Sequence, residues 1–91
     1  FPHADILNEK RSLVKAFFAE EMNQYRITFT APLINRAAVI AFMTYGESKA
    51  NAVYQSLRGP SDPQKYPAQL IRPRQGKVHW FVDTEAAQQV V

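Results

Sequence analysis

The chain of 91 residues contains no cysteine, and this absence excludes both a disulfide scaffold and a zinc site built on thiolates. Long apolar runs are also missing, because the longest, residues 37–45 with Thr44 inside it, is far too short to span a bilayer. The first residues lack the basic stretch and apolar core of a secretory signal peptide. We therefore expect no membrane partner and a cytoplasmic location.

The chain has no large excess of charge of either sign. It contains eleven lysine and arginine residues and eight aspartate and glutamate residues, which give a net charge of +3. Nucleic-acid-binding proteins usually gather a basic excess on one face or helix. Here the excess is dispersed, and only the loop Arg72–Lys77 is locally dense in basic residues. The pattern argues against nucleic acid as a partner and predicts no more than a modest preference for anions.

The apolar content is that of a folded domain, with 46% hydrophobic and 12% aromatic residues. Apolar periodicity predicts the order strand, strand, strand, helix, strand, helix. Strands are expected at 13–18, 25–30, 38–43 and 77–82, helices at 48–58 and 85–90, and short turns near Pro32 and at 68–71. Gly59 is expected to end the first helix in a left-handed conformation, and Asp83 or Thr84 to cap the second.

The segment Ala38–Met43 is apolar without alternation, which is typical of a central strand buried on both faces of a parallel sheet. The strand–helix–strand order predicts an α/β fold with a parallel-rich sheet flanked by helices. Two helices are too few to cover both faces of such a sheet, and the chain begins with Phe1 instead of methionine. We therefore expect residues 1–91 to be the C-terminal portion of a single α/β domain whose N-terminal part is absent.

A candidate phosphate site follows the central strand, where Gly46 makes a turn and Lys49 lies in the first turn of the next helix. Ligands of open α/β sheets bind beyond the carboxyl ends of the strands. Backbone N–H groups and the positive end of a helix dipole favour an anion at such a place. The bland alternative is a surface lysine beside an ordinary turn, and the spacing of a P-loop is absent.

Catalytic and metal-binding residues are sparse. His3 and His79 are the only histidines, and His79 alternates with Val78 and Trp80, so it is expected to face solvent or to be a satisfied residue of the sheet. Two such histidines do not assemble a Ser-His-Asp set, and no histidine and carboxylate have the spacing of helical metal ligands. We therefore predict no metal site and no catalytic residue within these 91 residues.

Four ordered motifs give the chain a specific resemblance. They are RITFTAPLINRAA (26–38), GESKA (46–50), PAQLIRP (67–73) and VHWFVD (78–83). Together they resemble the C-terminal half of the 6-phosphogluconolactonases, which carry similar motifs in the same order. Phe1 and Pro2 resemble the end of that family's GxDGHTASLFP motif. Tyr45 is a small departure from the family, because it replaces the threonine that usually precedes the glycine of the 46–50 motif.

The resemblance implies a lactone hydrolase of the pentose phosphate pathway, without metal or organic cofactor, and a fold shared with glucosamine-6-phosphate deaminases. It implies a phosphorylated sugar lactone as substrate and the missing N-terminal half as the partner segment. The family's presumed general base, the histidine of GxDGH, would lie upstream of residue 1. Lys49 matches the family's phosphate-contacting lysine, with Gly46 in the same turn. Arg26 and Asn35 match motif positions that either touch substrate or hold the fold.

Two rival functions remain open from the sequence. A deaminase or isomerase acting on glucosamine 6-phosphate shares the fold, although the segments 26–35 and 67–70 favour the lactonase. A non-catalytic module that binds nucleic acid through the basic loop is the other, and no aromatic RNA-binding signature supports it.

Overall fold

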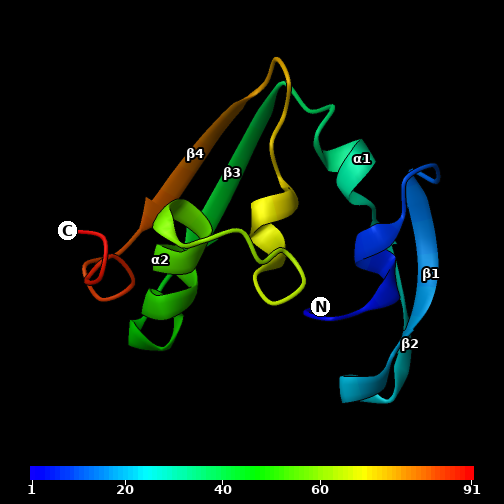
Figure 1. Cartoon of the computed structure of the whole chain (residues 1–91), viewed down its shortest axis with the longest axis horizontal. Helices are drawn as coiled ribbons and strands as arrows, with labels where there is room; N and C mark the ends of the chain where they lie inside the picture. The colour runs from blue at the N-terminus through cyan, green and yellow to red at the C-terminus, as the bar shows by residue number, and fades with distance from the viewer.

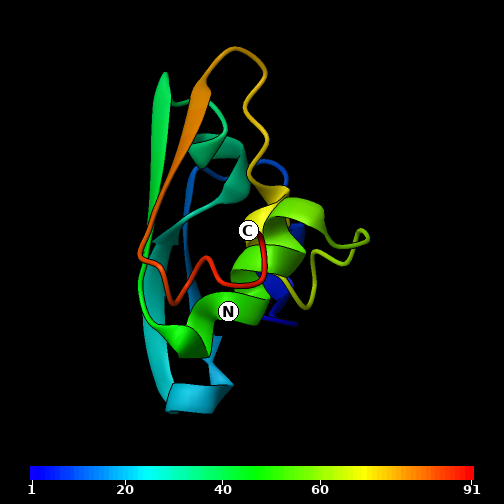
Figure 2. The same ribbon diagram turned by 90° about the vertical axis from the view of Figure 1, so that its left-hand side faces the viewer.

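The computed structural model describes all of residues 1–91 and has an α/β fold with two sheets of two strands each. Strands β1 (Val14–Ala19) and β2 (Gln24–Phe29) pair antiparallel, whereas β3 (Val39–Thr44) and β4 (Lys77–Val82) pair in parallel. Both sheets lie on the same side of the molecule, and helix α2 (Ala50–Arg58) lies on the other side (Figure 2). No helix combines the length and apolar character needed to cross a membrane.

The larger part of the core lies between β3, β4 and the helical segments that connect them, while Ile6 and Ala19 are buried in the N-terminal part of the chain. After β3 the chain passes through η3 (Glu47–Lys49), α2 and η4 (Pro67–Leu70) before β4 begins. Ala50 and Val53 of α2 are each only 1% exposed. Phe42 and Trp80 are register partners, and their rings stack with centroids 4.2 Å apart. The burial of these apolar and aromatic side chains holds α2 against one face of the parallel pair.

The β1–β2 hairpin is separate from this core and presents an apolar face to solvent. Val14, Ala16 and Phe18 lie directly opposite Phe29, Ile27 and Tyr25, so all six side chains share one face. Tyr25 and Ile27 are 79% and 78% exposed. The prediction of a half-buried strand here is therefore wrong for this chain, because nothing in it covers that face.

The predicted order of elements is confirmed for every strand, and β4 has the predicted bounds. The short helix α1 (Ala31–Ile34), with Pro32 in its first turn, and η4 confirm the two predicted helical turns. The α/β fold is confirmed, although only one of the two sheets is parallel. The hairpin adds an antiparallel pair that apolar periodicity alone does not distinguish from strands of a parallel sheet.

One predicted helix end and one predicted helix are wrong. Gly59 is extended, with φ −77° and ψ 167°, because the chain leaves α2 directly toward Pro60. The segment 85–90 forms successive turns instead of a helix, with a bond from the Ala87 N–H to the Asp83 carbonyl followed by shorter-range bonds. A helix of six residues is too short to stabilise itself without tertiary packing. Asp83 nevertheless caps these turns as predicted, because its carboxylate accepts the Ala86 N–H at 2.8 Å.

The prediction that Ala38–Met43 is buried on both faces is also wrong for this chain. Strand β3 pairs with β4 alone, and its residues alternate between exposed and half-buried. Val39 and Met43 are 61% and 69% exposed and share the exposed face of the strand. Within these 91 residues, one face of this apolar strand is therefore exposed and one of its edges has no hydrogen-bonded neighbour.

Candidate functional site

The turn Gly46–Lys49 lies beyond the carboxyl end of β3, where α2 begins, as the sequence predicts (Figure 1). Lys49 occupies the N-cap position of α2 and is exposed. The chain's one ion pair joins Lys15 to Glu9, so the Lys49 ammonium has no carboxylate partner. An unpaired cation at the N-terminus of a helix can meet an anion together with the helix dipole.

Gly46 gives this turn its shape. Its φ of 95° and ψ of 155° lie in a region that is essentially restricted to glycine. Its N–H donates to both carboxylate oxygens of Asp83, at 3.1 Å to Oδ1 and 3.2 Å to Oδ2. The hydrogen bonds from Ala86 and Gly46 lower the pKa of Asp83, because they favour its charged form. The Gly46 N–H is thus already engaged by an anionic group of the chain itself.

Asn35 and Arg26, the two motif residues whose role the sequence left open, lie elsewhere. The Asn35 side chain bridges two backbone groups, donating to the Leu70 carbonyl at 3.0 Å and accepting the Arg72 N–H at 2.7 Å. It therefore ties the end of α1 to the loop before β4. Arg26 is exposed on β2 and its guanidinium contacts Met22 Sδ. Figure 1 shows β2 and the start of α2 on opposite sides of the molecule.

Gln69, which the sequence analysis did not single out, is a buried polar residue, 7% exposed. Its amide nitrogen donates to the Gln55 carbonyl at 2.8 Å and to the Pro60 carbonyl at 3.2 Å, and its oxygen accepts the Asp62 N–H at 2.7 Å. It thereby joins the end of α2, the loop 60–62 and η4. A lone glutamine among apolar residues in the PAQL segment was the available signal.

The two histidines do not join the Gly46–Lys49 turn. His79 is exposed on the open face of β4, near Phe81. His3 has a left-handed φ of 62° and its N–H donates to the Gln64 carbonyl at 2.7 Å. No three histidine, aspartate or glutamate residues gather closely enough to hold a metal ion.

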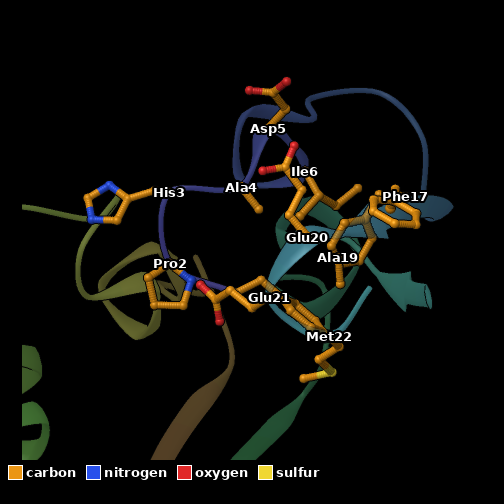
Figure 3. A pocket seen from close by; sticks show the side chains of 12 residues that line it. Pro2, His3, Ala4, Asp5, Ile6, Phe17, Ala19, Glu20, Glu21 and Met22 are labelled. Atoms are coloured by element: carbon orange, nitrogen blue, oxygen red, sulfur yellow. The ribbon is translucent and has the colours of Figure 1, made fainter. Parts of the chain in front are cut away.

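A hollow of about 500 Å³ lies between the N-terminal segment and the turn that joins β1 to β2. Its polar lining is acidic, with Asp5, Glu20 and Glu21, and the ring of His3 points away from the two glutamates (Figure 3). The rest is mostly apolar, including Phe1 and Phe17, whose rings meet edge to face at 4.7 Å. An acidic lining repels a phosphate dianion, so this hollow suits an apolar or cationic occupant better.

A second hollow, of about 590 Å³, lies at the amino ends of β3 and β4, the edge opposite the Gly46–Lys49 turn. Arg36 and Arg74 line it, and no acidic residue does. Both arginines are exposed, and the hollow is open to solvent. Ligands of α/β sheets bind at the carboxyl edge of the strands, so this hollow is on the wrong edge for a substrate site.

Comparison with known proteins places this architecture in a family. Residues 1–80 match the family described as glucosamine-6-phosphate isomerases/6-phosphogluconolactonase. The 6-phosphogluconolactonase of Synechocystis sp. is 39% identical over 88 residues, which cover 97% of this chain and 35% of that protein. The human 6-phosphogluconolactonase is 33% identical over 88 residues, or 96% of this chain and 34% of that protein.

The fold is similar to a solved structure as well. The 6-phosphogluconolactonase of Trypanosoma brucei matches with a TM-score of 0.84 at 22% identity, over 100% of this chain and 36% of that chain. The chain thus spans about a third of the length of the relatives that it matches. It belongs to the glucosamine-6-phosphate isomerase/6-phosphogluconolactonase family.

Proposed function

We propose that this chain is the C-terminal portion of the single catalytic domain of a 6-phosphogluconolactonase, which hydrolyses 6-phosphoglucono-1,5-lactone to 6-phosphogluconate. The observation that carries the proposal is the similarity to 6-phosphogluconolactonases along 97% of the chain, in regions that hold all four motifs. The family also includes glucosamine-6-phosphate isomerases, but the relatives compared above are lactonases. The proposed location is cytoplasmic, and the reaction uses no metal or organic cofactor.

The open apolar surfaces support the assignment of residues 1–91 to a part of a larger domain. The hairpin face and the outer face of β3 and β4 expose large side chains, among them Ile27, Phe29, Met43 and Phe81. Burial of such side chains is the main favourable term in folding. The N-terminal part of the same protein, predicted from the sequence as its N-terminal half, is the proposed partner for these surfaces. It would account for the remaining two thirds or so of the relatives' length.

In this proposal the chain contributes phosphate binding and not the catalytic base. Lys49 contacts the substrate phosphate, while Gly46 shapes the turn that presents it. A general base must come within hydrogen-bond reach of the attacking water. His79 lies on the open face of β4 and His3 lies beside the acidic hollow, so neither shares a site with Lys49. The base is assigned to the N-terminal part of the domain.

The test is lactone hydrolysis by the full-length parent protein and by the 91-residue chain, measured as acid release from 6-phosphogluconolactone. We expect turnover by the parent and no rate above spontaneous hydrolysis for the chain alone. Turnover by the isolated chain would overturn the assignment of the base. Release of ammonia from glucosamine 6-phosphate by the parent, without lactone hydrolysis, would establish the deaminase instead.

The phosphate contact is tested by Lys49→Met in the parent. Loss of a charge-assisted contact should lower kcat/KM about ten- to a hundredfold, mainly through KM, because the phosphate charge barely changes during the reaction. A lactone without the phosphate should be hydrolysed equally by both proteins. The matched control is Arg58→Met, which removes the same charge from an exposed residue at the other end of α2. A change of less than about twofold for Lys49→Met would leave it a surface lysine.

A further inference from the structure

Asp83 joins the ends of two strands at the proposed phosphate site. It follows β4 directly, and Gly46 follows β3 after one residue. Because β3 and β4 are parallel neighbours, their carboxyl ends lie at the same edge. The Asp83 carboxylate accepts the Gly46 N–H with both oxygens and the Ala86 N–H with Oδ1. One side chain thus holds the backbone that follows each strand.

Hydrogen bonds fix the backbone of the turn at Gly46. A Cβ placed on Gly46 would meet no heavy atom within 4 Å, so no neighbouring group fills the space where a side chain would lie. Two bonds define its geometry: the N–H of Gly46 donates to Asp83, and the carbonyl of Gly46 accepts the Lys49 N–H at 3.1 Å. The position of the Lys49 backbone therefore depends, through Gly46, on Asp83.

We propose that Asp83 is a positioning residue for phosphate binding, which holds the Gly46 turn so that Lys49 meets the substrate phosphate. The inference rests on the proposed function and adds a residue to it. Asp83 also fills the hydrogen-bonding capacity of the Gly46 N–H. The phosphate is therefore bound by Lys49 and the helix N-terminus beyond it, and not by the Gly46 N–H.

Simple electrostatics and positioning predict opposite effects for Asp83→Asn. A carboxylate beside a phosphate site repels the dianion, so its neutralisation alone should lower KM. Positioning predicts that KM rises, because asparagine offers one acceptor oxygen where two N–H groups of different loops compete. A misplacement of about 1 Å in a binding group can cost up to a hundredfold, and we expect a rise of about tenfold.

The experiment compares Asp83→Asn with Glu85→Gln in the parent protein. Glu85 is an exposed carboxylate two residues away with no hydrogen-bond partner for its side chain, so its substitution removes the same charge from the same loop. We expect a raised KM, with kcat nearly unchanged, for Asp83→Asn and the phosphorylated lactone only. Glu85→Gln should leave KM unchanged or slightly lower.

A second measurement does not need activity. In the parent protein, amide hydrogen exchange at Gly46 should accelerate at least about tenfold in Asp83→Asn and stay unchanged in Glu85→Gln. Unchanged exchange, or an unchanged or lowered KM, would overturn the inference. Equal losses with phosphorylated and unphosphorylated lactones would make Asp83 a purely structural cap and would also overturn it. Absence of lactonase activity from the parent would refute the proposed function alone, since the exchange result stands independently.

Discussion

The unit β3–α2–β4 and the β1–β2 hairpin differ in the interactions that hold them together. In the first, Asn35, Gln69 and Asp83 each tie backbone groups of distant segments together. In the hairpin, the strand ladder is supplemented mainly by Thr30, whose hydroxyl bonds the Ser12 carbonyl at 2.6 Å. The hairpin keeps one whole apolar face open, whereas α2 covers one face of the parallel pair.

Hydrogen bonding and apolar burial are satisfied to different extents in this chain. Every buried side-chain nitrogen and oxygen has a hydrogen-bond partner within these 91 residues. Apolar burial is far less complete, because only seven residues are buried and large side chains remain exposed in both sheets. Directional hydrogen bonds are satisfied by nearby segments, whereas burial needs a second surface of matching area. Polar completeness therefore does not imply that a segment is a complete folding unit.

The largest expected effect is in the first unit, for Gln69→Leu. The substitution leaves the Pro60 carbonyl and the Asp62 N–H without their side-chain partner, whereas the Gln55 carbonyl keeps its bond from the Gly59 N–H. Each buried polar group left unpaired costs about 1–3 kcal/mol. We expect a loss of about 2 kcal/mol in the free energy of unfolding, measured by urea denaturation. Gln75→Leu, in an exposed loop, is the matched control and should change stability by less than about 0.5 kcal/mol. Equal losses of stability in the two variants would show that the hydrogen bonds of Gln69 do not stabilise the unit β3–α2–β4.

An intermediate effect is expected at the open face of the hairpin. The 91-residue chain should self-associate and bind a hydrophobic dye, because exposed apolar faces and free strand edges invite association. Ile27→Lys should reduce both, as measured by light scattering and dye fluorescence, with little change in stability. Gln24→Lys adds the same charge to the other face of β2 and should reduce them less. A monodisperse, dye-silent chain without either substitution would show that the face needs no cover.

The smallest expected effect is at the base of the hairpin, where Glu9 accepts hydrogen bonds from Lys15 Nζ and the N–H groups of Ser12 and Arg11. These bonds, the one from Lys15 foremost, lower the pKa of Glu9 from 4.5 to about 2. Because the folded pKa is the lower one, Glu9 stabilises the fold above about pH 4.5, and this contribution is lost as the pH falls toward 2.

Glu9→Gln should therefore lower Tm slightly at pH 7 and reduce the fall in Tm between pH 4.5 and 2. Thermal unfolding followed by circular dichroism at several pH values measures both changes. Glu85→Gln is the control and should leave the pH dependence as it is in the unsubstituted chain. A pH dependence that Glu9→Gln does not alter would mean that this cluster adds nothing to the hairpin.

The sequence predicted the strands and turns better than it predicted which of their faces are buried and which distant residues they contact. Strand β4 and the turn at Pro67–Leu70 follow from local patterns of apolar, glycine and proline residues. Whether β3 is covered on both faces depends on which segments pack against it, and no local pattern contains that information. The pairing of Asp83 with Gly46 joins positions 37 residues apart, so it was visible only once the two parallel strands were adjacent.

In the candidate site, too, local features were predicted and long-range contacts were not. Lys49 and Gly46 were predicted from a turn followed by a helix, and the structure has both elements there. Asn35 lay in a recognised motif, yet its two backbone partners come from the loop before β4. A motif match reports that a residue matters, whereas its hydrogen-bond partners decide whether it holds the backbone or faces a ligand.

The backbone conformation of Gly46 limits which amino acids can occupy this position. The space around its missing side chain is empty, so the restriction at this position is one of handedness and not of size. An L-residue is strained at φ 95°, whereas a D-residue adopts the mirror-image conformation at no such cost. A D-alanine introduced by chemical synthesis is suited to this backbone conformation and would reduce the freedom of the unfolded chain. Ribosomal synthesis, confined to one hand, has only glycine for this position.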